Sequence, residues 1–143
     1  MNFLTLYILS ILSFRAATPE NDTLPTFDKN YFRSPLDIPL YLTGNFGEPR
    51  KSHFHSGLDI KTNEKEGLNV YAVADGYISR INVSPYGYGN AIYITHPNGY
   101  VSVYGHLRNF NTPITNYLRK EQYNDKRFAE NIILPPNFIA VKK

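Results

Sequence analysis

The segment AIYITHPNGYVSVYGHL, residues 91–107, constrains the fold more than any other part of the sequence. Two runs rich in β-branched and aromatic residues flank the tetrapeptide HPNG, and such residues favour strands. Asn98-Gly99 in this tetrapeptide supplies the positive φ angles that a type I′ turn needs. We therefore expect residues 91–95 and 100–107 to form an antiparallel β-hairpin closed by a type I′ turn.

Further strands are expected on both sides of this hairpin. Residues 70–83, VYAVADGYISRINV, are interpreted as two strands that join or kink at Asp75-Gly76. In the second half, alternation places every second residue from Tyr77 to Val83 on one face, less cleanly than in the first half. A final strand is expected in FIAVKK, residues 138–143, after a Pro-Pro break.

One helix is expected between these strands. Thr112 can cap a helix that has Pro113 at its first position. Ile114, Tyr117 and Leu118 then fall on one helical face. The sequence predicts a helix over residues 113–123.

Composition agrees with a single, strand-rich globular domain. The chain has 143 residues, of which 42% are hydrophobic and 19% charged, with 12 Tyr and 9 Phe. Its formal net charge of +3 is mild and its basic residues are scattered, so nucleic-acid binding is not expected. The absence of cysteine excludes disulfides and thiolate ligands, so any zinc must be held by histidine and carboxylate.

The chain begins with an apolar run, MNFLTLYILSILSF, about as long as the hydrophobic part of a signal peptide. The run is too short to cross a bilayer, so no stable membrane span is expected. We interpret residues 1–17 as a signal peptide, residues 18–35 as a linker or N-terminal arm, and residues 36–143 as one β domain. Export to the periplasm or cell envelope follows. The alternative for the first segment is a hydrophobic strand or helix of the domain.

His55 and Asp59, in the segment HSGLD, are the strongest pair of candidate metal ligands. Gly57 between them lets the backbone turn sharply, so the two side chains can converge on one ion. The alternative is a surface histidine and a carboxylate that caps a turn, since such short matches occur often by chance.

The other three histidines have weaker signals. His106 follows the second strand of the hairpin, where it could face a cleft or be a hydrogen-bonded edge residue. His96 precedes Pro97 at the hairpin turn and is expected to be solvated. His53 is expected to support its neighbours or to contact substrate, and not to bind metal.

Several short motifs follow one another between Thr43 and Leu107: GNFGEPR, HSGLDI, GLNVYAVADGYI, GYGN, HPNG and YGHL. In this order they resemble the lysostaphin/LytM-type zinc metallopeptidases, which cleave peptides in bacterial peptidoglycan. Each motif is common alone, but the ordered set is specific. The matching residues are Phe46, Gly47, Arg50, His55, Asp59, Gly67, Val70, Ala72, Gly76, Ile78, Gly87, Gly89, Asn90, His96, Gly99, Tyr104 and His106.

The resemblance implies a mostly β fold: a duplicated hybrid motif in an open antiparallel β-sandwich, with the helix as an insertion. It implies that His55 and Asp59 are two of three zinc ligands. His106 is then the cleft histidine that activates water or stabilises the transition state. Zinc in such a site lowers the pKa of water and polarises the scissile carbonyl.

One departure from the family pattern is large. The family has a later H-x-H that supplies the third zinc ligand and another catalytic histidine, and no histidine follows His106 here. Residues 138–143 resemble the strand before that motif. We therefore expect a domain that is incomplete at its C-terminus, without a third protein ligand and with little peptidase activity.

Two functions remain open at this point. The first is a zinc metalloendopeptidase that acts on peptidoglycan peptides. The second is a non-catalytic module of the same fold that binds the cell wall or regulates a hydrolase. A carrier-type hybrid barrel ranks last, because no exposed lysine stands at a hairpin tip in the expected way.

Overall fold

Antiparallel strands dominate the computed structural model, which describes residues 28–143. The predicted signal peptide and residues 18–27 of the predicted linker lie outside the described residues. A mostly β fold with one helix is confirmed. The elements in chain order are β1 (Leu42–Gly44), β2 (Asp59–Ile60), β3 (Gly76–Val83), β4 (Asn90–Thr95), β5 (Val101–Tyr104), α1 (Thr112–Asp125), β6 (Glu130–Ile133) and β7 (Ala140–Val141).

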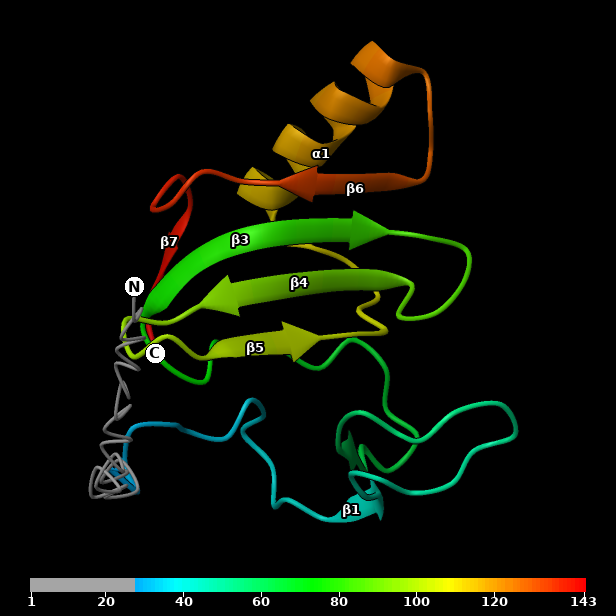
Figure 1. Ribbon diagram of the computed structural model, residues 1–143, viewed down its shortest axis with the longest axis vertical. Helices are drawn as coiled ribbons and strands as arrows, with labels where there is room; N and C mark the ends of the chain where they lie inside the picture. The colour runs from blue at the N-terminus through cyan, green and yellow to red at the C-terminus, as the bar shows by residue number, and fades with distance from the viewer. Residues whose placement is uncertain (1–27) are drawn as a thin grey trace, which may run out of the picture.

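The strands form two sheets. The larger has the order β5-β4-β3-β6, and β7 also pairs with the start of β3, so β3 is the central strand. The smaller consists of β1 and β2 alone. Figure 1 shows β1 beyond β5, and α1 with β6 on the other side of β3 and β4. The described part of the chain therefore has antiparallel sheets without a closed barrel.

A β-bulge in β3 changes which of its residues face the core. Opposite β4, the register runs from Ile78 directly to Arg80, so Ser79 is the extra residue. The bulge places Ile78 on the same face as Ile81 and Val83, and all three are buried. The prediction of an odd-numbered face from residue 77 onward was therefore wrong at its start, because alternation alone assumes an unbroken ladder.

The predicted hairpin is confirmed, but its turn is of another type. β4 and β5 pair antiparallel, and the N–H of Gly99 donates to the carbonyl of His96 at 3.0 Å. Gly99 alone in this turn has a positive φ, of 84°. Pro97 has its φ fixed near −65°, which suits a type I turn followed by a left-handed glycine and excludes type I′.

The core lies between the large sheet and the helix. Ile78 and Ile81 are fully buried, and Ile114 and Leu118 of α1 pack with them in one cluster. The helix therefore presents the face that its sequence predicted. No helix within residues 28–143 is long and apolar enough to cross a bilayer.

The N-terminus of α1 differs by one residue from the prediction. Asn111 caps the helix, and its side-chain oxygen accepts the N–H of Ile114 at 3.1 Å. Thr112 was predicted as the cap and instead begins the helix. Both residues can cap, but asparagine is the stronger cap, and the helix starts one residue earlier because of it.

Residues 70–74 were predicted as a strand and do not form one. Two backbone hydrogen bonds hold this segment against the N-terminal arm: Arg33 N–H to Val73 O at 2.8 Å, and Tyr71 N–H to Pro35 O at 2.9 Å. These contacts are too few for a ladder, since the partner is an irregular arm.

His96 is buried, so its prediction as a solvated turn residue was wrong. It is the first residue of the hairpin turn, and its Nδ1 lies 2.8 Å from the carbonyl oxygen of Asp75 and its Nε2 2.9 Å from Ser102 Oγ. The Ser102 hydroxyl is 3.0 Å from that of Tyr104, which accepts the N–H of Val73 at 2.9 Å. This network fastens the hairpin to the segment before β3.

Replacement of His96 tests this network. His96→Leu should lower the free energy of unfolding by about 1–3 kcal/mol, because it leaves the Asp75 carbonyl and the Ser102 hydroxyl without their partner. Chemical denaturation measures the change. His53→Leu, at an exposed histidine, is the control and should stay within about 0.5 kcal/mol of wild type. Equal losses in the two variants would contradict the role given to His96.

Candidate functional site

A small hairpin over residues 47–55 positions the first site residue. The N–H of Gly47 donates to the carbonyl of His55 at 2.7 Å, and the N–H of His55 donates to that of Glu48 at 2.8 Å. The N–H of Arg50 closes the turn. The hairpin brings the Arg50 side chain back toward His55. The local sequence does not predict this hairpin, because GEPRKSH lacks the alternation typical of strands.

Asp59 is the first residue of β2. The strand pairs with β1 at Gly44↔Asp59 and Leu42↔Ile60. β2 is only two residues long. The pairing with Gly44 and the backbone bend at Gly57 hold Asp59 in place. The two strands thus place the carboxylate beside the 47–55 hairpin.

His55 and Asp59 converge. Nε2 of His55 lies 3.2 Å from Oδ1 of Asp59, and Nδ1 lies 3.0 Å from the carbonyl oxygen of Asn45. A carbonyl oxygen only accepts hydrogen bonds, so Nδ1 carries the hydrogen. In a neutral imidazole, Nε2 then has its lone pair directed toward the carboxylate.

The geometry of this pair fits two ligands of one zinc ion. Ligand atoms at about 2.0–2.2 Å in a tetrahedral site are about 3.3–3.6 Å apart, and the observed 3.2 Å lies just below this range. Metal-bound histidines commonly donate their other N–H to a backbone carbonyl. The same separation suits a hydrogen bond when the imidazole is protonated, so the pair can hold either a metal ion or a proton.

The pair is a partial metal site. Among residues 28–143, no three or more His, Cys, Asp or Glu side chains gather as a metal-binding group. His53 is exposed and its Nδ1 lies 3.3 Å from Ser52 Oγ. The described residues thus bring together the two predicted ligands and no third.

Arg50 is a further member of the site that its local sequence does not reveal. Its Nη2 lies 2.7 Å from Oδ2 of Asp59 and 3.3 Å from Oε2 of Glu48. The same nitrogen is 3.5 Å from Nδ1 of His55. The arginine was noted only as part of a motif, and its contact with Asp59 depends on the fold of the small hairpin.

His106 is exposed and has a left-handed backbone, with a φ of 55°. Non-glycine residues with positive φ are uncommon and often occur at functional positions. Its N–H donates to the carbonyl of Tyr88 at 2.8 Å, and the two rings are 6.5 Å apart in an edge arrangement. The backbone after β5 is therefore held in one conformation.

Tyr88 connects the two halves of the site. Its hydroxyl lies 2.6 Å from Oγ of Ser56, the residue after His55, while its backbone holds His106. Gly105 leaves room for the ring of Tyr88, which a Cβ there would contact at 3.0 Å. Sequence reasoning did not single out Tyr88. Its position between glycines, GYG, was the available signal.

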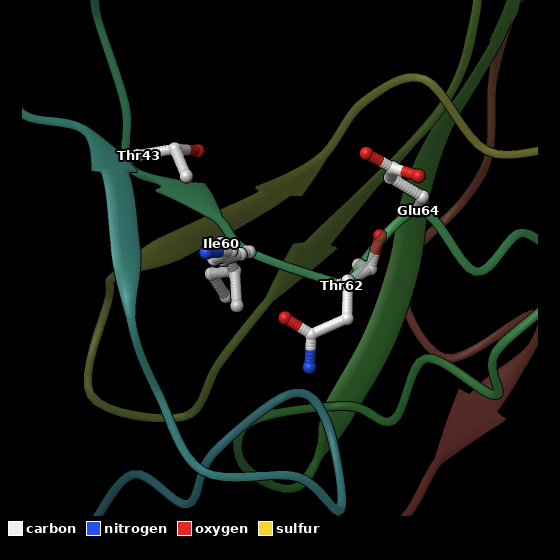
Figure 2. A pocket seen from close by; sticks show the side chains of 6 residues that line it. Thr43, Ile60, Thr62 and Glu64 are labelled. Atoms are coloured by element: carbon white, nitrogen blue, oxygen red, sulfur yellow. The ribbon is translucent and has the colours of Figure 1, made fainter.

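An open cavity of about 550 Å³ borders the two-stranded sheet. Figure 2 shows the side chains that line it, from β1, β2 and the loop after β2. All the lining residues except Ile60 have polar or charged side chains, and the His55–Asp59 pair is not among them. The cavity therefore adjoins the strand that carries Asp59 without containing the ligand pair. The lining residues are Thr43, Ile60, Lys61, Thr62, Asn63 and Glu64.

Comparison with known proteins gives one match. The model of a family described as peptidase family M23 matches residues 53–123, about half of the chain. This span contains His55, Asp59, Tyr88 and His106. No curated protein and no solved structure matches the chain.

The bond between Tyr88 and Ser56 can be tested with a double-mutant cycle. Tyr88→Phe and Ser56→Ala should each lower the free energy of unfolding by about 0.5–1.5 kcal/mol, and the double variant should lose little more, because both remove one hydrogen bond. Chemical denaturation measures all three. Tyr86→Phe, at a strongly exposed tyrosine, is the control. Fully additive losses would show that the two hydroxyls do not interact.

Proposed function

This chain belongs to peptidase family M23, and on that premise we propose that it is a zinc-dependent endopeptidase that cleaves peptide bonds in bacterial peptidoglycan. Membership of a peptidase family implies a hydrolase and a peptide substrate; zinc and peptidoglycan belong to the proposal. The observation that carries the proposal is the His55–Asp59 pair, whose Nε2 and Oδ1 atoms face each other at 3.2 Å.

In this proposal His55 and Asp59 hold the metal. The hydrogen bond from His55 Nδ1 to the carbonyl of Asn45 orients the imidazole and keeps Nε2 available. Zinc, when bound, supplies a Lewis acid that polarises the scissile carbonyl. A catalytic zinc needs about three protein ligands, so the described pair requires one more.

His106 is proposed to handle protons during the reaction. Its side chain is exposed and its backbone is fixed through Tyr88, so an imidazole is presented to solvent at a defined place. Imidazole can give and take protons near neutral pH. The connection through Tyr88 and Ser56 supports a position for His106 on the same side of the molecule as His55.

The substrate and location remain parts of the proposal. The cavity beside β2 offers polar backbone and side-chain groups next to Asp59, which suits an extended peptide. The apolar run at the start of the chain supports export to the periplasm or cell envelope, where peptidoglycan is found.

A second function has its own supporting observation. Phe46, Phe54 and Leu58 are all exposed, and they flank His55 and Asp59 along the chain. Exposed apolar side chains around a site can serve binding without turnover. The alternative is therefore a non-catalytic module that binds the cell wall or regulates a hydrolase.

Variants of the proposed ligands test the zinc assignment. His55→Ala and Asp59→Asn should each abolish zinc binding, because each removes one of two observed donors. His106→Ala should leave zinc binding unchanged and lower any turnover of muropeptides by at least about 100-fold. Elemental analysis and a muropeptide digestion assay measure these effects.

The outcomes separate the two functions. Stoichiometric zinc retained by either ligand variant would remove the assignment of that residue. Binding of purified peptidoglycan by the wild-type chain, with no turnover and no effect of His55→Ala on binding, would support the non-catalytic module.

A further inference from the structure

Arg50 occupies the oxygen of Asp59 that His55 leaves free. Its Nη2 lies 2.7 Å from Oδ2, while His55 Nε2 faces Oδ1 at 3.2 Å. Both oxygens of this carboxylate are therefore engaged, one by a permanent cation and one by the imidazole. Arginine stays charged at every pH relevant to a protein, so its charge is always present beside Asp59.

The backbone leaves room for this contact. A Cβ on Gly44 would overlap both the Asp59 carboxylate and the Arg50 guanidinium. Gly44 is buried and pairs directly with Asp59 across the small sheet. The absence of a side chain at residue 44 is therefore what allows the ion pair to form in this position.

The guanidinium of Arg50 also has a second anionic partner, Glu48. Oε2 of Glu48 lies 3.3 Å from the same Nη2, and the side chain of Arg50 is 37% exposed. The guanidinium can therefore leave Asp59 while keeping an anionic partner or contact with water. This movement requires little change in the backbone, because Glu48 and Arg50 belong to the same small hairpin.

We propose that Arg50 is a built-in competitor of the metal for Asp59, an inference that rests on the zinc site proposed above. A metal ion held by His55 and Asp59 would share one carboxylate with the guanidinium. Two cations on one carboxylate repel each other, and each reduces the negative potential that attracts the other. Arg50 therefore neutralises Asp59 in the metal-free chain, lowers its affinity for metal, and moves toward Glu48 when metal binds.

The contact of Arg50 with Asp59 also has an effect that would raise metal affinity instead of lowering it. Hydrogen bonds to a ligating carboxylate usually orient it and raise metal affinity. A neutral donor brings only that benefit, whereas Arg50 adds a full positive charge. Removal of the charge should therefore strengthen metal binding if competition dominates, and weaken it if orientation dominates.

Zinc affinity of the full chain and its variants decides between these effects. Arg50→Met should bind zinc about tenfold more tightly than wild type, from relief of like-charge repulsion. Lys51→Met is the matched control. It makes the same charge change at the next residue, whose ammonium forms no ion pair within the described part of the chain, and its affinity should stay within about twofold of wild type. Competition with a chromophoric chelator measures the affinities.

Thermal unfolding in the presence of a chelator tests the ion pair without any metal. Arg50→Met and Asp59→Asn should each lower Tm, and the Tm of the double variant should fall no further than that of the less stable single variant.

Arg50→Lys is a further variant for the zinc titration. It keeps the positive charge and should bind zinc about as weakly as wild type.

Each outcome bears on a different claim. Zinc affinity that is equal or weaker in Arg50→Met, with Asp59-dependent binding in wild type, overturns the competition and leaves the proposed function standing. Absence of zinc binding in every chain overturns the proposed function and the competition together. Tighter binding in Lys51→Met to the same degree as in Arg50→Met shows a general charge effect and also overturns the competition.

Discussion

The hydrogen bond between His55 Nδ1 and the carbonyl of Asn45 is the interaction on which the site depends. It selects the imidazole tautomer and turns Nε2 toward Asp59. Nε2 of His55 and Oδ1 of Asp59 then face each other as a pair of candidate metal-ligand atoms. Without it, the ring of His55 could rotate and the carboxylate would face only Arg50. The small hairpin over residues 47–55 supplies this bond by bringing His55 back beside Asn45.

The large sheet supports the site from a distance. β3 is central in the sheet, and its partner β4 begins just after Tyr88, the residue that contacts both Ser56 and His106. The tyrosine therefore connects a rigid sheet with an irregular loop that has few strand contacts of its own. Functional groups on loops need such fixed points, because loop backbone is otherwise the most mobile part of a fold.

The sequence predicted those features that depend on local pattern. The 91–107 hairpin, the helix and the pairing of His55 with Asp59 follow from turn residues, helical spacing and a glycine between two ligands. It failed where partners come from far along the chain: the face of Ile78 depends on a bulge against β4, and the burial of His96 depends on Ser102 and Asp75.

The contact between Arg50 and Asp59 was missed for the same reason, since it requires a hairpin that the local pattern does not signal. Anomalous diffraction at the zinc edge, from crystals of the zinc-loaded chain, tests most directly whether His55 and Asp59 bind one metal ion. If both residues bind the ion, a peak should lie about 2 Å from both Nε2 of His55 and Oδ1 of Asp59, with Nδ1 still hydrogen-bonded to the carbonyl of Asn45. A peak at any other residues, or a zinc ion bound by only one of the two, would contradict this assignment.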